Sequence, residues 1–452
     1  MADYDLILRR GMVVRPDGAA LLDLGISDGK VASIETDLAG STRTEVDVSG
    51  RWIYPGVIDP HVHLNEPGRA DWEGIDTGSR ALAAGGGTVF FDMPINSTPP
   101  VLDVATLEAK RALMGEKSRC DFAIWGGLTP QNVSGMRALA AAGVIGFKAF
   151  LSSSGTDDFP RTDTGTLFAS MKIAAELGLI VAVHAENEAI VSNLTREAIA
   201  GGRTTMRDYL RSRPAIAEWE AIQRVILLAE ETGCAIHIVH VSTSRGVQFI
   251  RAARRTGVSI TGETCPHYLI LTDEDAERIG ALAKCAPPLR PAADRNALWN
   301  HLWLGDLDWI ASDHSPAPPD LKTGSNFFEI WGGISGAQHT FPLVLNEAGA
   351  HSPSLAPTQL ADLFARNIAL RFNLSDRKGS IEPGLDADLL VIDPNANESI
   401  TTESLQYRHR QTPYVGRTLP AAVTHTFLRG EITFEHGNFP GVPRGRMLRP
   451  SA

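Results

Sequence analysis

The sequence predicts an α/β protein in which a (β/α)8 TIM-like barrel is joined to a small β-sandwich built from both chain ends. Three observations predict this fold. Eight apolar, β-rich runs alternate with helix-like stretches between about residues 55 and 375, as expected for parallel strands buried on both faces. Short strands and turns occupy the two ends. The 452 residues, 43% of them hydrophobic, are enough for a large core and a second domain.

Each end of the chain is predicted to form short strands separated by turns. Residues 1–54 contain the runs "YDLILRR", "MVV", "LLDLGIS" and "VASIE", with the turn sequences "RPDG" and "DGK" between them. Residues 376–452 return to short strands in "DADLLVIDP" and "AAVTHTFLRGEITFEHG". We expect the two segments to pair as the first and second parts of one β-sandwich, and the second part to continue into a C-terminal tail.

The barrel is expected over residues 55–375. An apolar run followed by a helix is the repeating unit of a parallel barrel. The eight runs are "GVIDPHVH", "TVFFDMP", "DFAIWGG", "VIGFKAFL", "IVAVHAE", "AIHIVHVS", "SITGETCPHY" and "WIASDHSP". Two further stretches with helical periodicity, "GGISGAQHTFPLVLNEA" and "SLAPTQLADLFARNIALRF", follow the eighth run.

The charge and the cysteines argue against several kinds of partner. A formal net charge of -11 and a pI near 5.6, without a cluster of Lys and Arg, disfavour nucleic acid and anionic membranes. The first residues lack a signal-peptide pattern, and no run approaches a membrane-spanning length. The four cysteines lack CxxC spacing, which indicates reduced, mostly buried thiols. We therefore expect a cytoplasmic protein that acts on a small neutral molecule.

Six polar residues close the predicted strands, at the end of the barrel where such enzymes place their active sites. Side chains alternate along a strand, so the two imidazoles of "HVH" in the first run point the same way. Neutral imidazole is the commonest metal ligand. Each residue alone also fits a structural role, such as a hydrogen-bonded core histidine or a loop cap. Together they favour a metal centre: His61, His63, Lys148, His184, His240 and Asp313.

Lys148, in "VIGFKAFL", needs its own explanation, because an ammonium group is no metal ligand and is costly to bury. Apolar surroundings lower the pKa of a lysine and favour the neutral amine, which can react with carbon dioxide. The resulting carbamate has two oxygens and could bridge two cations. A lysine that reaches along the strand end to solvent is the alternative. If the carbamate forms, one of the two cations would be held by His61, His63 and Asp313, and the other by His184 and His240.

The ordered motifs "DPHVH", "GFKAF", "HAEN", "HVS" and "SDHSP" resemble those of the cyclic amidohydrolases, the group of dihydroorotases, hydantoinases and allantoinases. The resemblance covers nearly the whole chain, including the split sandwich. It implies that all six residues bind two divalent metal ions, commonly zinc, with cobalt or manganese tolerated, and that Lys148 is carboxylated. It also implies a homo-oligomer, a homotetramer by analogy. A non-enzymatic scaffold that has lost ligands is the alternative, and the complete ligand set argues against it.

Departures from the family patterns reduce the number of cyclic amides that are expected as the substrate. Dihydroorotases usually have an arginine where this chain has Asn65, and a neutral amide cannot replace a cation that holds a carboxylate. Dihydropyrimidinase-type hydantoinases tend to have a tyrosine near Ser153. The stretches "HLNEPGRADWEG" and "YRHRQTPYVGRTLPAAVTHTFLRGEI" resemble allantoinases more closely, as does "LAKCAPPLRP", although Ala286 replaces a frequent serine. We expect the hydrolysis of allantoin to allantoate, with hydantoinase and dihydroorotase activities as alternatives.

The mechanism that this resemblance implies is attack on the ring carbonyl by a hydroxide that bridges the two cations. Asp313 would take the proton and return it to the departing ring nitrogen. Three positions are candidates for contacts with the substrate, and each also fits a turn residue or a cap: Asn96, Ser315 and the backbone around Gly332. The polar loop "SSSGTDDFPRTDTG" is expected to be a mobile rim of the pocket.

Overall fold

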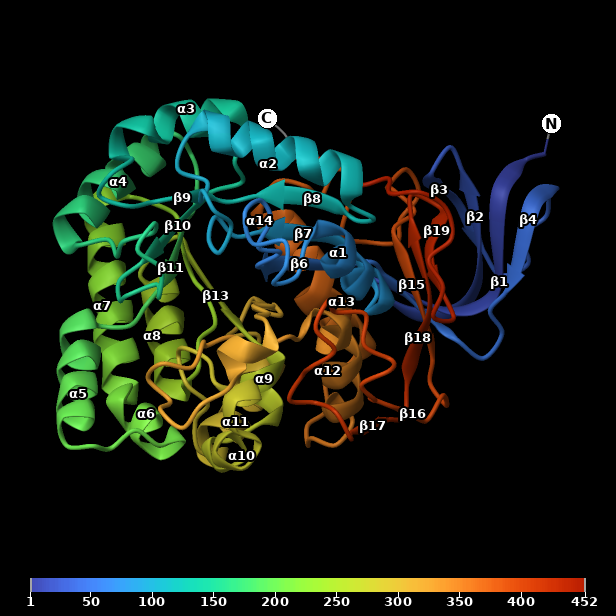
Figure 1. The fold of residues 1–452 in the computed structure, drawn as a ribbon. Helices are drawn as coiled ribbons and strands as arrows, with labels where there is room; N and C mark the ends of the chain where they lie inside the picture. Colours follow the sequence, from blue (N-terminus) through green and yellow to red (C-terminus); the bar gives the residue numbers. More distant parts are fainter. Residues whose placement is uncertain (1, 451–452) are drawn as a thin grey trace.

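The computed structural model describes residues 2–450. In it the predicted barrel forms from the eight apolar runs (Figure 1). Its strands are β6 (Val57–Val62), β7 (Gly87–Asp92), β8 (Asp121–Ile124), β10 (Phe147–Phe150), β11 (Val181–His184), β12 (Ile236–Ile238), β13 (Ile260–Thr264) and β14 (Trp309–Ile310). Neighbouring strands pair in parallel from β6 to β8 and from β10 to β14, and the short β9 (Gly126–Gly127), which follows β8, pairs with β10. A parallel bridge between Val62 and His314 closes the ring.

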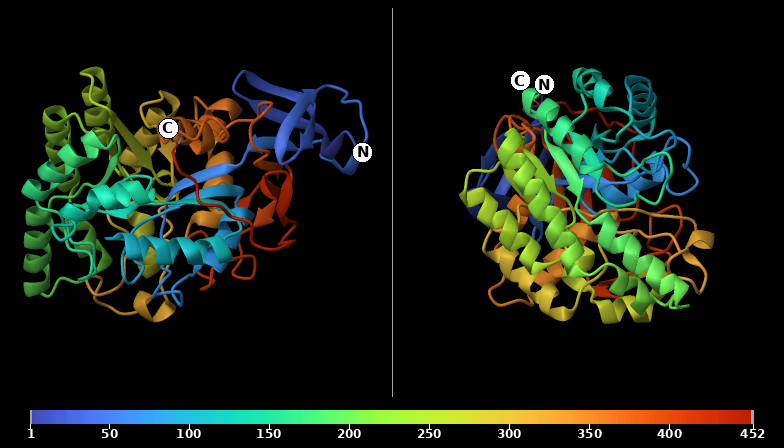
Figure 2. Two further views of the ribbon diagram at one scale, coloured as in Figure 1. Left: turned by 90° about the horizontal axis from the view of Figure 1, so that it is seen from above. Right: turned by 90° about the vertical axis from the view of Figure 1, so that its left-hand side faces the viewer.

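Helices connect the strands and cover the outside of the barrel (Figures 1 and 2). Several begin at a side chain that accepts a hydrogen bond from the first turn, which satisfies backbone N–H groups that a helix leaves free. These caps are Asp103, Asp163, Asn187, Thr205, Thr243 and Thr272. The helices between strands are α1 (Ile75–Ala84), α2 (Val104–Lys117), α3 (Met136–Ala142), α4 (Thr164–Glu176), α5 (Glu188–Ala200), α6 (Met206–Ser212), α7 (Ala215–Thr232), α8 (Ser244–Arg255), α9 (Pro266–Ile270), α10 (Asp273–Ile279) and α11 (Ala292–Trp303).

The two helical stretches expected after the eighth run are also present. The first forms α12 (Thr340–Ala348), and the second forms α13 (Pro357–Ala361), the π-helical turn η5 (Asp362–Arg366) and α14 (Asn367–Arg371). No helix among residues 2–450 combines the length and the hydropathy that crossing a membrane requires. All four cysteines are free and buried, as predicted.

The two chain ends pair in one sheet beside the barrel, where blue and red strands lie together in Figure 1. The strand β5 joins them: Tyr54 pairs with Leu390 of β15 on one side, and Ile53 pairs with Val13 of β1 on the other. The strands are β1 (Tyr4–Arg15), β2 (Gly18–Ser27), β3 (Lys30–Glu35), β4 (Thr42–Asp47), β5 (Trp52–Pro55), β15 (Leu389–Asp393), β18 (Ala422–Leu428) and β19 (Glu431–Glu435). The boundary expected between residues 54 and 55 falls within β5, and the exact domain limits stay a prediction.

A buried cluster of charges joins this sheet to the barrel. Nζ of Lys378 lies 2.8 Å from Asp121, 2.9 Å from Asp386 and 2.6 Å from Asp388. Asp121 begins β8 and also pairs with Arg429, which follows β18. Burial alone would lower the pKa of Lys378, but the surrounding carboxylates raise it above its ordinary value. The lysine therefore stays charged and links strands that lie far apart in the sequence.

Candidate metal centre

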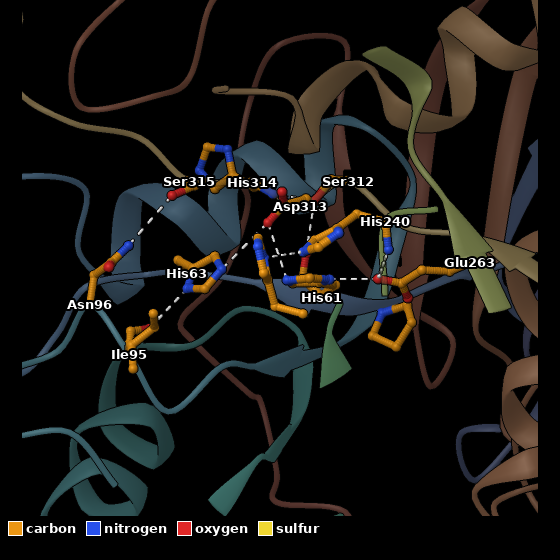
Figure 3. Close-up of polar contacts among 12 residues, drawn as sticks. His61, His63, Ile95, Asn96, His240, Glu263, Ser312, Asp313, His314 and Ser315 are labelled. Atoms are coloured by element: carbon orange, nitrogen blue, oxygen red, sulfur yellow. Dashed lines mark hydrogen bonds and ion pairs between the residues drawn. The ribbon is translucent and has the colours of Figure 1, made fainter. Parts of the chain in front are cut away.

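Two imidazoles and a carboxylate meet at the carboxyl ends of the barrel strands. His61 lies in β6 and His63 directly after it, and both rings approach Asp313, which follows β14 (Figure 3). Oδ1 of Asp313 is 3.1 Å from Nε2 of His61 and 3.4 Å from Nε2 of His63. One ligand atom from each residue lies within 4.8 Å of the other two. Nitrogen and oxygen donors gathered in this way suit a divalent cation such as zinc.

A second pair of imidazoles lies beside the first. Nδ1 of His184, the last residue of β11, is 3.0 Å from Nε2 of His240, which follows β12. The rings of His240 and His61 are 5.5 Å apart between their centres, so the four imidazoles form one cluster. Nε2 of His184 faces Glu186 at 2.8 Å, which leaves Nδ1 to bind a metal.

Lys148 lies inside β10, with its side chain buried. Within the described part of the chain, its Nζ has no hydrogen-bond partner, and it sits 4.2 Å from the centre of the Phe150 ring. Burial lowers the pKa of Lys148 to about 7. A large fraction of the side chain is therefore neutral amine near neutral pH, which is the form that reacts with carbon dioxide.

The backbone is strained at two of the expected ligands. His240 has a φ of 41° and Asp313 a φ of 44°, in the left-handed region that residues other than glycine rarely adopt. Both residues lie just beyond the last paired residue of their strands, Ile238 and Ile310. Such strain persists only where the surrounding structure enforces it, and it is concentrated at functional sites.

Glu263, in β13, binds the ring nitrogen of His61 that faces away from Asp313, and no motif in the sequence predicted this residue. It faces Nδ1 of His61 at 2.5 Å (Figure 3). It also faces Nε2 of His237 at 3.1 Å and accepts from the indole N–H of Trp309 at 2.8 Å. A carboxylate on one ring nitrogen fixes the orientation of an imidazole and directs its other nitrogen to the metal. The available signal was the acidic residue near the end of the seventh run, "SITGETCPHY".

The ionisation states of the cluster suit metal binding. Burial would raise the pKa of Asp313, but the imidazoles of His61 and His63 outweigh burial and bring that pKa below its usual range. Burial lowers the pKa of His61, His184 and His240. These three imidazoles are therefore neutral near pH 7 and keep a lone pair for a cation, while Asp313 is a carboxylate.

A cavity of about 360 Å³ opens onto this cluster. All three positions expected to contact the substrate line it: Asn96, Ser315 and Gly332. The amide nitrogen of Asn96 donates to Oγ of Ser315 at 3.4 Å, so these two side chains form one polar wall. Ala286 and Ser153 also line the cavity.

Two residues discussed from the sequence do not line this cavity. Lys148 is buried within the barrel strand β10. Asn65 is buried, and its side chain donates to the carbonyl of Pro316 at 3.3 Å. The polar loop after β10 does form a rim, because Ser154 and Gly155 line the cavity beside Trp331, while its mobility stays a prediction.

These residues fit a metal centre on the chemistry of their side chains. Four imidazoles and one carboxylate are a donor mixture that suits zinc and that cobalt and manganese can also use. The unpartnered amine of Lys148 is the group that carboxylation would turn into a further oxygen donor.

Comparisons with known proteins show the family to which this chain is related. Residues 52–433 match the amidohydrolase family. The chain is 51% identical over 450 residues to the allantoinase of Rubrobacter xylanophilus, covering 100% of this chain and 98% of that protein. It is 51% identical over 448 residues to the allantoinase of Solibacter usitatus, covering 99% and 97%. The solved structure of the L-hydantoinase (dihydropyrimidinase) from Arthrobacter aurescens superposes with a TM-score of 0.95 at 31% identity, covering 99% of this chain and 100% of that chain.

Proposed function

Because the chain belongs to the amidohydrolase family, we propose that it is a metal-dependent hydrolase that opens the ring of allantoin and releases allantoate. The observation that supports allantoin as the substrate is the 51% identity, over the full chain, to proteins named allantoinase. The meeting of His61, His63 and Asp313 above a cavity supports the hydrolytic chemistry.

The proposed centre contains two divalent cations, with zinc favoured and cobalt or manganese as substitutes. When bound, the cations supply Lewis acidity and an activated water. Carboxylated Lys148 would contribute oxygen donors between the two imidazole pairs. The proposed ligands are His61, His63, Lys148, His184, His240 and Asp313.

Asp313 is the proposed proton carrier of the reaction. It is a carboxylate near neutral pH and lies at the cavity wall, so it can accept a proton from the attacking water. The same oxygen can then donate that proton to the ring nitrogen as the amide bond breaks. Glu263 holds His61 in place during both steps, because its carboxylate binds the ring nitrogen that faces away from Asp313.

Selectivity would come from the polar wall of the cavity. Allantoin is a hydantoin with a ureido arm, and Asn96, Ser315 and the backbone at Gly332 offer groups that can pair with it. Around bare hydantoin such a group would lack a partner, at a cost of about 1–3 kcal/mol. One unpaired group corresponds to a preference of about 5- to 150-fold for allantoin.

The test compares kcat/KM for allantoin, hydantoin, dihydrouracil and dihydroorotate on protein with measured metal content. We expect allantoin to be opened with the highest kcat/KM and chelation to abolish turnover. Full activity of protein shown to be free of metal contradicts the metal-dependent mechanism.

A hydantoinase activity is the second candidate, because the L-hydantoinase of Arthrobacter aurescens shares this fold at 31% identity. Faster turnover of an alkyl- or aryl-substituted hydantoin than of either allantoin enantiomer would show that the protein is a hydantoinase. The dihydroorotase alternative has less support, since buried Asn65 is bound to the backbone of Pro316 and carries no charge to hold a carboxylate.

Two further expectations accompany the proposed function. A cytoplasmic location fits the four free, buried thiols, which require no oxidising compartment. A homotetramer is proposed by analogy with the family, and light scattering of the purified protein tests it.

A further inference from the structure

The wall of the cavity around Gly332 is held by a buried lysine that the proposed reaction does not use. Nζ of Lys322, at the end of η3 (Pro319–Lys322), donates to the carbonyl of Gly333 at 2.5 Å, of Trp331 at 3.0 Å and of Ala281 at 3.5 Å. Within residues 2–450, no carboxylate is paired with this amine. An amine is costly to bury, and all three of its acceptors belong to the backbone.

Fixing the carbonyl of Trp331 also fixes the direction of the next N–H group. A trans peptide is planar, and its C=O and N–H bonds point in opposite directions. The carbonyl of Trp331 points to Lys322, so the N–H of Gly332 points away from Lys322. Among the described residues, this N–H has no hydrogen-bond partner, and Gly332 lines the cavity.

The neighbouring peptide groups are all held by the protein. The N–H of Trp331 donates to the carbonyl of Leu321 at 2.9 Å, and the N–H of Gly333 donates to that of Lys284 at 2.7 Å. Lys284, a second buried lysine, donates from its Nζ to the carbonyl of Ile330. The N–H of Gly332 therefore stands free between two amides that are fixed.

Gly332 is also a glycine that the packing of the protein does not require. Its φ lies outside the left-handed region, and a Cβ built on it would meet no atom nearer than the Lys284 carbonyl, at 4.0 Å. Gly333 differs, because a Cβ there would lie 2.3 Å from the carbonyl oxygen of Ser315. A glycine without a steric reason of its own is expected where the backbone approaches a ligand closely.

We propose that Lys322 is a positioning residue, which holds the Trp331 carbonyl and so directs the N–H of Gly332 to a carbonyl oxygen of the bound cyclic amide. This inference rests on the proposed function, because it concerns the substrate of that same cavity. Lys322 does not touch the substrate; it acts through one peptide group.

The test is Lys322→Met, which keeps the length of the side chain and removes its donors. We expect KM for allantoin to rise about 5- to 150-fold, the effect of losing one hydrogen bond to the substrate. We expect kcat to stay within about twofold, because a contact made equally in the ground and transition states changes KM alone. Metal content should match that of the wild type. Lys30→Met is the control, since Lys30 also donates to a backbone carbonyl, that of Gly384 at 3.1 Å, on the exposed sheet.

Gly332→Pro removes the same N–H group and leaves Lys322 intact. If both residues act through this group, the double variant has the KM of a single variant, because effects on one interaction are not additive. Additive effects, or an unchanged KM in either single variant, would overturn the proposal. Where Lys322→Met does not fold, Lys322→Gln keeps an N–H donor and should raise KM by less than Gly332→Pro does; an equal or larger rise counts against the proposal.

The substrate assignment is tested separately in the same experiment. If the wild type opens hydantoin and leaves allantoin unchanged, the proposed substrate is wrong. The variants are then compared on hydantoin, whose ring carbonyls remain available to the N–H of Gly332. A wild-type KM for hydantoin in Lys322→Met would then reject the positioning role on its own.

Discussion

Asp313 combines a backbone conformation and a charge that can be separated by substitution. Asparagine has the same shape and tolerates a positive φ, here 44°, better than most residues. Asp313→Asn should therefore keep the fold and much of the metal while losing the ability to carry a proton. We expect kcat to fall about 10²- to 10⁴-fold, measured at saturating allantoin. An unchanged kcat would place the proton transfer on another residue.

Lys148 provides a test of the proposed carbamate. Lys148→Ala should fold, lose most of its metal and lose nearly all activity, because the amine lies buried without a protein partner that its removal would leave unpaired. Lys148→Met is the matched control. A short carboxylic acid added to the solution should restore activity to the alanine variant, whose cavity can admit it, and not to the methionine variant. Metal content equal to that of the wild type in Lys148→Ala would contradict the bridging role.

The sequence predicted the candidate metal ligands more fully than the residues and backbone turns that hold those ligands in place. His61, His63 and Asp313 could be found because each closes an apolar run, and the barrel brings the ends of all runs together. Glu263 sits in such a run too, but an acid that binds an imidazole carries no spacing of its own in the sequence. The left-handed turn at His240 was equally hidden, since residues with an ordinary preference for strands surround it.

Among the elements, the loop from β14 to α12 depends on glycine at one position. Gly333 has a φ of 137°, and a Cβ there would lie 2.3 Å from the carbonyl oxygen of Ser315. Gly333→Ala should therefore lower the free energy of unfolding by about 1–3 kcal/mol, the cost of a strained backbone, and weaken substrate binding. Denaturant unfolding measures the first effect.

Gly349 is the control for this substitution. It follows α12 with a φ of -71°, and no atom of residues 2–450 lies within 4 Å of a Cβ built on it. Gly349→Ala should change stability by no more than about 1 kcal/mol, in the stabilising direction. Equal changes in the free energy of unfolding for the two substitutions would show that the backbone at Gly333 accommodates a Cβ without loss of stability.

Element positions followed from apolar periodicity, and element ends did not. All eight barrel strands form at the runs identified, with β7 beginning one residue before its run, yet β14 contains only Trp309 and Ile310, although its run continues to "SDHSP". The chain leaves the strand there because its backbone must turn toward the cluster at Asp313, a constraint set by partners distant in sequence. The pairing of β5 with β15 likewise depends on contacts that no local pattern encodes.

For the whole molecule, the charge cluster around Lys378 determines how firmly the sheet is attached to the barrel. Its ammonium is buried among the carboxylates of Asp121, Asp386 and Asp388. Lys378→Met leaves these carboxylates buried and uncompensated, so we expect a loss of about 3–5 kcal/mol, read from chemical denaturation. The exposed Lys172→Met should leave stability unchanged. A loss below about 1 kcal/mol in Lys378→Met would mean that water or Arg429 compensates the cluster.

The sheet that unites both chain ends also sets the order in which the protein can be completed during synthesis. Leu390 pairs with Tyr54, 336 residues earlier in the chain. At about 5–20 residues per second, a ribosome needs roughly 17–67 s to add the missing partner. Throughout that interval β5 presents an unpaired edge, a template for aggregation. A chain released before Leu389 would keep this open edge permanently, so premature termination even late in translation is expected to lower solubility.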